Sequence, residues 1–209
     1  MSRVSVLVFC VLLLCGCVTT NVSKNYSLKE NSGTGLVVGS ITYDGSYSGY
    51  AVSYRRAPSE ASGRFQSGQS NVVIPYFPAG EFETMGINGN LIAAELPAGD
   101  YVIDAWSVGS GAAFVRPTRP FSILFSVIPG KATYIGNFHF TQLSRMGLTV
   151  TGAKVDFSDK RERDSDVLKK HYPNLSTVSI VSAVEPGLHV TELGGLHHTT
   201  ISIDVPITY

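Results

Sequence analysis

Cysteine is scarce in this chain of 209 residues, and the three that occur, Cys10, Cys15 and Cys17, all lie near the N-terminus. A domain built from the rest of the chain can therefore form no internal disulfide. It also has no thiol for redox chemistry or nucleophilic catalysis, and no cysteine ligand for zinc. The hydrophobic core has to stabilise such a domain without a covalent crosslink.

Charge is scarce as well. Charged residues make up 15% of the chain, and 16 Lys and Arg balance 16 Asp and Glu. Nucleic acid is bound by proteins that carry a strong, localised positive field. A chain with a formal net charge of zero has no such field, so we expect no nucleic-acid partner.

The only long apolar run is at the N-terminus, where Arg3 precedes an apolar segment at residues 4–15. This segment is too short for a transmembrane helix, which needs about twenty apolar residues. A basic residue followed by a short apolar segment is typical of a signal peptide.

The sequence Leu14-Cys15-Gly16-Cys17 resembles the bacterial lipobox, although Cys15 stands where Ala, Ser or Thr is usual. The resemblance implies that residues 1–16 are a signal peptide cleaved between Gly16 and Cys17, and that Cys17 receives a lipid anchor. Several acyl chains on one residue bind a membrane almost irreversibly, because each buried methylene contributes about 0.8 kcal/mol. Val18 follows the cysteine instead of Asp, which in the sorting rule that this resembles implies the outer membrane. We expect a lipid-anchored protein of the cell envelope.

Residues 17–33 hold the cysteine and a polar sequence without apolar periodicity. We interpret this segment as a flexible tether with a reach of roughly 20 to 25 Å. The remaining residues, 34–209, have the length of a single domain with its own core.

The composition of this domain favours Gly, Ser, Thr, Val, Ile and Tyr, which suits short strands joined by tight turns. Hairpins are predicted between 36–43 and 50–54, and between 82–87 and 91–96 through Asn88-Gly89. Further strands are predicted at 101–108, 121–127, 132–140 and 201–209, the last at a sheet edge because of Pro206. Residues 57–71 are interpreted as a surface loop.

One helix is predicted at residues 160–171, with Asp159 as its cap and Pro173 at its end. Many short strands separated by turn signals, together with one short helix, predict an antiparallel, immunoglobulin-like β-sandwich.

Three segments resemble prealbumin-like sandwich domains found in bacterial lipoproteins of unknown function. They are residues 95–101 (ELPAGDY), 125–137 (FSVIPGKATYIGN) and 163–175, the last including Tyr172-Pro173-Asn174-Leu175. The resemblance covers roughly residues 90–175. It implies the sandwich fold and brings no catalytic residue with it.

No group of residues has the spacing of a catalytic or metal site. The histidines follow no ligand pattern: they are His139, His171, His189, His197 and His198. On a strand, His197 and His198 would point to opposite faces. Asp164 and Asp166 do not face each other on a helix, and Gly109-Ser110-Gly111 is interpreted as a loop. We therefore expect no metal, no cofactor and no enzymatic activity.

Aromatic residues allow two interpretations. Trp106 and a series of tyrosines could form a binding face for sugar, or they could belong to the core: the tyrosines are Tyr43, Tyr47, Tyr50, Tyr54 and Tyr76. Most aromatic residues on strands pack against neighbours, so we favour the core.

These observations favour a non-enzymatic envelope module that binds a protein partner. Alternatives are a lipoprotein that binds carbohydrate or peptidoglycan, a lipoprotein of a secretion apparatus, and a hydrolase with an unrecognised site.

Overall fold

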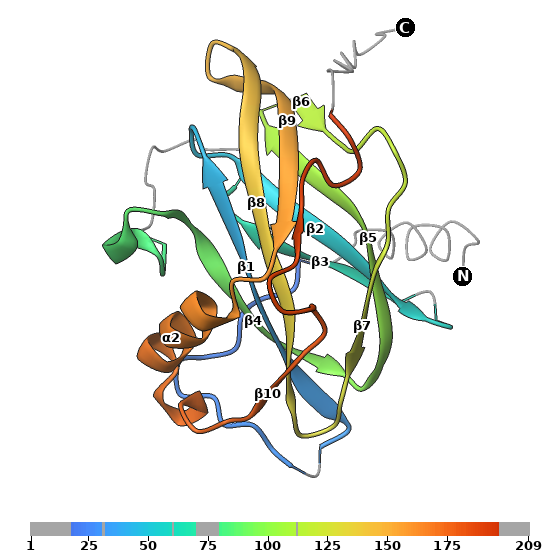
Figure 1. Ribbon diagram of the computed structural model, residues 1–209, viewed down its shortest axis with the longest axis vertical. Coiled ribbons are helices and arrows are strands. Elements are labelled where there is room, and N and C mark those ends of the chain that lie inside the picture. Colours follow the sequence, from blue (N-terminus) through green and yellow to red (C-terminus); the bar gives the residue numbers. More distant parts are fainter. Residues whose placement is uncertain (1–17, 31, 60, 70–79, 112, 197–209) are drawn as a thin grey trace, which may run out of the picture.

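Two β-sheets pack face to face around a shared apolar core (Figure 1). The computed structural model describes residues 18–30, 32–59, 61–69, 80–111 and 113–196. The expected signal peptide, Cys17, Tyr76, His197, His198 and the predicted strand 201–209 lie outside these residues.

The first sheet has six strands in the order β11-β9-β8-β1-β4, with β10 also paired to β8. Its members are β1 (Thr34–Asp44), β4 (Asn88–Pro97), β8 (Ala132–Met146), β9 (Thr149–Ser158), β10 (Ile180–Ser182) and β11 (His189–Val190). Most of its pairs are antiparallel, but β1 and β10 both run parallel to β8.

The second sheet has five strands in the order β3-β2-β5-β6, with β7 also paired to β5, and all of its pairs are antiparallel. Its members are β2 (Gly49–Ala57), β3 (Ser62–Ser67), β5 (Gly99–Ser110), β6 (Ala113–Val115) and β7 (Ile123–Val127). The predicted mostly-β sandwich is thus confirmed.

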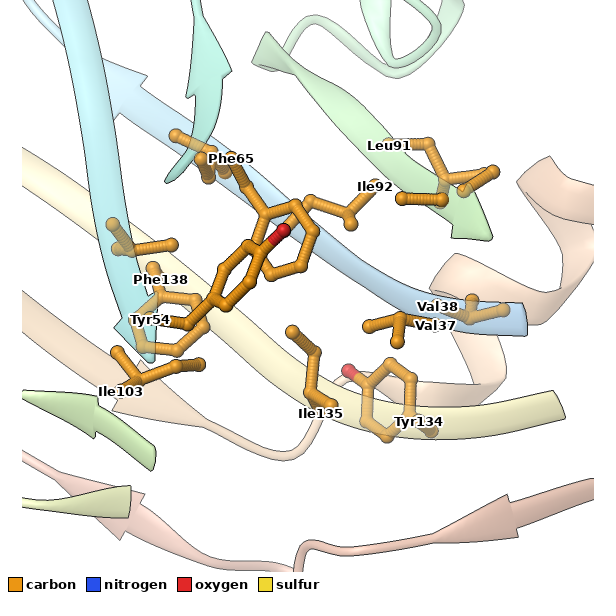
Figure 2. Close-up of a cluster of buried hydrophobic side chains, with 14 of the residues drawn as sticks. Val37, Val38, Tyr54, Phe65, Leu91, Ile92, Ile103, Tyr134, Ile135 and Phe138 are labelled. Carbon is orange, nitrogen blue, oxygen red and sulfur yellow. The ribbon is translucent and has the colours of Figure 1, made fainter. Parts of the chain in front are cut away.

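The core lies between the sheets, and Figure 2 shows side chains from both meeting there, among them Tyr54, Ile103 and Phe138. β1 is buried on both faces, since Leu36, Val37 and Val38 are all fully covered. The reason is the helix α2 (Arg161–His171), which lies over the outer face of the six-stranded sheet and packs against β1 and β4.

The two predicted hairpins are wrong. β1 and β2 are consecutive strands, but β1 pairs with β4 and β8 whereas β2 pairs with β3 and β5. Residues 82–87 contain the short 3-10 helix η1 (Glu83–Met85), and Asn88-Gly89 opens β4 instead of forming a turn. Gly89, at φ +141°, lets β4 approach the Ile41 backbone so closely that a Cβ atom would clash with it.

The predicted loop 57–71 contains the edge strand β3. Its apolar content is too low for a strand pattern, because Phe65 alone carries a large side chain into the core. The predicted helix is confirmed with a start one residue later, at Arg161. The predicted cap is wrong, because Lys160 is the N-cap residue; Asp159 lies one position before it, and its Oδ1 accepts a hydrogen bond of 3.1 Å from the Arg161 amide. A second 3-10 helix, η2 (Pro173–Leu175), follows it.

Residues 18–30, which we call the N-terminal strap, are docked on the domain, so the expected flexible tether is wrong. Val18 forms a parallel bridge with Arg64 of β3, and the Val22 amide donates to the Ala93 carbonyl of β4 at 2.7 Å. The strap thereby covers neighbouring edges of both sheets. Its apolar side chains pack against the core at irregular spacing, which hides them from a periodicity test: they are Val22, Tyr26 and Leu28.

The C-terminal described residues cross the opposite side of the sandwich. The Leu193 amide donates to the Val155 carbonyl of β9 at 2.7 Å, and the Leu193 carbonyl accepts from Trp106 Nε1 at 2.7 Å. Trp106 lies on β5 and is buried, so this segment joins the two sheets.

Candidate functional site

A buried polar network joins helix α2 to the six-stranded sheet. Asp164 has 0% exposure, and its Oδ2 accepts hydrogen bonds from Ser40 Oγ at 2.7 Å and from the Tyr134 hydroxyl at 3.0 Å. Its Oδ1 accepts from Arg163 Nη2 at 2.7 Å. Burial raises the pKa of Asp164, and the Arg163 guanidinium and the hydrogen bonds offset this only in part. Burial likewise raises the pKa of Tyr134.

The network continues toward the surface along β1 and β8. Asn137 Nδ2 donates to Ser40 Oγ at 2.9 Å and to Thr42 Oγ1 at 3.1 Å. His139 follows, with Nδ1 2.9 Å from Thr42 Oγ1 and Nε2 3.1 Å from Asp44 Oδ2. Alternate residues of a strand share one face, which is why these side chains form a continuous row on the outer face of the sheet.

Above this row lies a polar cleft of about 270 Å³ between the sheet, the start of α2 and β11. Its wall is made of side chains from β1, β8, β9, α2 and β11: Thr42, Asp44, Asn137, His139, Asp156, Ser158, Lys160, Arg163 and His189, with Gly86, Ile87 and Asn88 at one side. Burial raises the pKa of Asp156, but hydrogen bonds from the Glu192 amide and Lys154 outweigh it and lower the pKa below its usual value. The cleft thus offers both donors and acceptors to a polar ligand.

Thr42, His139 and Asp44 form a hydroxyl, imidazole and carboxylate series, as in hydrolase triads. Thr42 is only 1% exposed, however, and its hydroxyl already contacts both Asn137 and His139. A substrate carbonyl cannot approach that oxygen, so we interpret the series as part of the structural network.

The other candidates from the sequence are separated. Among the residues that the structure describes, no group of three or more His, Cys, Asp or Glu side chains is placed to hold a metal ion. His139 and His189 both line the cleft, whereas His171 ends α2. The loop predicted at Gly109-Ser110-Gly111 is wrong for its first two residues, because Gly109 and the buried Ser110 are the last residues of β5. Asp166 is exposed, on another face of α2 from Asp164.

The tyrosines that the structure describes belong mainly to the core. Tyr43, Tyr50 and Tyr54 are buried, and the rings of Tyr43 and Tyr50 stack with centroids 4.3 Å apart. Burial raises the pKa of Tyr50 to about 12. Tyr47 is half-buried and lies in the β1–β2 connection. The prediction of a core role is therefore confirmed for three of these residues and for Trp106.

An exposed apolar surface lies at the turn between β8 and β9, a hairpin that projects beyond the sandwich in Figure 1. We call it the apolar tip: Leu143, Met146 and Leu148, which are 48%, 64% and 86% exposed. Gly147, at φ +61°, forms the tight turn with Leu148 between the paired Met146 and Thr149. The neighbouring strand β6, which packs against β9, adds the half-exposed Phe114. Leucine and methionine are typical core residues, so the sequence alone did not indicate an exposed apolar surface at this turn.

Comparison with protein-family models, with curated proteins and with solved structures finds no match for this chain. Within the described part of the chain, none of the helices has the length and apolar character needed to span a bilayer.

Proposed function

We propose that this chain is a lipid-anchored, non-enzymatic module of the bacterial cell envelope that binds an envelope protein through its apolar tip. The lipobox-like sequence ending in Gly16-Cys17 supports the anchor, and the segments similar to prealbumin-like lipoprotein domains support the same class. The observation that supports a protein partner is the exposure of Leu148, an apolar residue at the end of a two-residue turn with 86% of its surface exposed.

Turns of this kind are normally polar, because water contacts them on most sides. Burying a leucine or methionine side chain against a partner contributes roughly 1.5 to 3 kcal/mol each. Three such side chains on one β-hairpin resemble the small apolar centre that dominates many protein interfaces. The paired strands β8 and β9 hold them in place before binding, which reduces the entropy lost on association.

We assign the buried polar network around Asp164 a structural role and not a catalytic one. Each hydroxyl in it already has a partner, and the network fixes α2 to the sheet.

The test is photo-crosslinking in cells from which the protein comes, with a photoreactive amino acid at Leu148 and, as a matched control, at Glu162 on α2. We expect one discrete protein adduct from position 148, none from 162, and loss of the adduct in Cys17→Ala. A companion variant, Met146→Ser, should weaken the adduct while the domain stays folded. Equal labelling from both positions, or adducts with lipid alone, would rule out a protein partner at the tip.

A second candidate is binding of carbohydrate or peptidoglycan, and the polar cleft favours it. Asp44 and His139 present an acceptor and an imidazole at its mouth, a combination that suits sugar hydroxyls. Retention on isolated cell-wall sacculi, lost in Asp44→Ala but kept in the tip variant Met146→Ser, would favour this function. A role in a secretion apparatus is a narrower form of the first proposal and requires the crosslinked partner to belong to one.

A further inference from the structure

We infer that the N-terminal strap fixes the orientation of the anchored domain, so that the side carrying the β3 edge lies directly against the lipid surface. This inference rests on the proposed lipidation of Cys17. It follows from how tightly the residue after that cysteine is held.

The strap is bound to β3 by both main chain and side chain. The Thr19 amide donates to the Arg64 carbonyl at 2.8 Å, and Val18 forms a parallel bridge with the same residue. The Thr19 hydroxyl lies 2.7 Å from the hydroxyl of Tyr54, which is itself only 8% exposed.

The next contacts bind the strap to β4. Asn21 Nδ2 donates to the Leu91 carbonyl at 2.7 Å, and Asn21 Oδ1 accepts from the Ala93 amide at 2.9 Å. A side-chain amide thus replaces a strand residue at the sheet edge, and the Val22 amide continues the pairing. Residues 18–22 are therefore part of the folded surface.

This docking removes almost all of the reach that a free tether would provide. Consecutive Cα atoms are about 3.8 Å apart, so the Cα atom of the lipidated residue, which directly precedes Val18, can be no farther than that from the Val18 Cα atom. A flexible segment of this length would separate membrane and domain by roughly 20 Å or more. With the strap docked, the glycerol of the anchor and the surface around Val18 have to meet at the level of the lipid headgroups.

The surface around Val18 fits that position chemically. Val18 is 43% exposed, and the outward face of β3 and its neighbour β2 presents Arg64 and Arg55. Arg55 also pairs with Asp104 at 2.5 Å. Arginine side chains place an apolar stem along a membrane surface and a guanidinium at the phosphates, so this face suits phospholipid headgroups.

The experiment uses the lipidated protein reconstituted in vesicles of phosphatidylethanolamine and phosphatidylglycerol, some of which carry nitroxide groups near the headgroups. The mature chain has no cysteine other than Cys17, whose thiol is bonded to lipid, so an added cysteine is labelled uniquely. A fluorophore is attached at Ser62→Cys on β3 or at Val190→Cys on β11. β3 lies beside β4, and β4 and β11 are opposite edges of the six-stranded sheet, about 19 Å apart at the usual strand spacing.

We expect the label at position 62 to lose most of its emission and the label at 190 to keep it. Insertion of a flexible Gly/Ser segment between Cys17 and Val18 should make the two labels equal. Equal quenching without the insertion, in protein that floats with the vesicles, would overturn the fixed orientation and leave the anchor intact. Flotation of Cys17→Ala to the same extent as the wild type would instead remove the anchor itself.

Discussion

Ser40 in the first strand donates a hydrogen bond of 2.7 Å to Asp164 in the helix, and both residues are fully buried. The bond joins parts of the chain that are 124 positions apart. It connects α2 to the sheet at a point where the helix offers a charged side chain instead of an apolar one. The helix therefore depends on a satisfied polar network for its position.

Removal of the Asp164 carboxylate should be strongly destabilising. Asp164→Ala leaves the hydroxyls of Ser40 and Tyr134 without an acceptor and leaves Arg163 only its hydrogen bond to Ser40 Oγ. The free energy of unfolding is expected to fall by about 3 kcal/mol. The matched control is Asp166→Ala on the exposed face of α2, with an expected change within about 0.5 kcal/mol. Urea unfolding of both variants provides the measurement, and similar losses would show that the network contributes little.

Two glycines with positive φ should differ sharply when replaced by alanine. Gly136, at φ +99°, faces Phe157 so closely that a Cβ atom would clash with its ring, whereas Gly147, at φ +61°, has open space around it. Gly147→Ala should cost about 1 kcal/mol from backbone strain alone. Gly136→Ala adds overpacking and should cost about 3 kcal/mol or more. A thermal unfolding series that ranked them in the opposite order would contradict this account of the core.

The strap should be released by loss of a single side chain. Asn21→Ala removes both hydrogen bonds to β4 and should expose residues 18–30 to proteases, with a loss of about 1 to 2 kcal/mol. Asn25→Ala is the control, because Asn25 contributes its backbone carbonyl, and not its side chain, to the bond with Asn174. Mass spectrometry of limited digests would identify the cut sites, and equal protection in both variants would show that the Asn21 side chain does not hold the strap in place.

Acid should weaken the domain partly through Glu81. Burial raises the pKa of its carboxyl, but hydrogen bonds from Asn90 at 2.9 Å and Lys24 at 3.1 Å outweigh that effect and lower the pKa. A carboxyl with a lowered folded-state pKa stabilises above its unfolded pKa, and this contribution is lost as the pH falls through the folded value. In unfolding measurements below about pH 5, the wild type should therefore lose stability more steeply than Glu81→Gln. Parallel pH profiles would show that the ionised Glu81 carboxylate contributes no stability.

The sequence predicted strands better than it predicted their partners. A run of apolar and β-branched residues located β1, which is buried on both faces, and alternation located β2. β2 could have continued the sheet of β1 or crossed to the other sheet, and packing between the two sheets decides this. The Gly-containing turn at Gly45 is compatible with either arrangement. Missing β3 and the strap has a related cause, since both use main-chain hydrogen bonds more than apolar side chains.

The site could not have been predicted from spacing. His139 and Asp44 are 95 positions apart and meet only because β1 and β8 are parallel neighbours. The sequence offers no local pattern for such a pair. The apolar tip was hidden for the opposite reason, because Leu143 and Met146 continue the composition of a buried strand past Thr141, where the pairing of β8 with β1 ends.

The parallel pairing of β1 with β8 also has a consequence for folding. One edge of β1 finds its partner only when residues 132–141 are available, and pairing over such a distance along the chain is slow. A growing chain that ends before residue 132 presents a long apolar strand with an open edge, which is the kind of surface that aggregates. We expect N-terminal fragments of this protein to be insoluble and the full chain to depend on chaperones until its synthesis is complete.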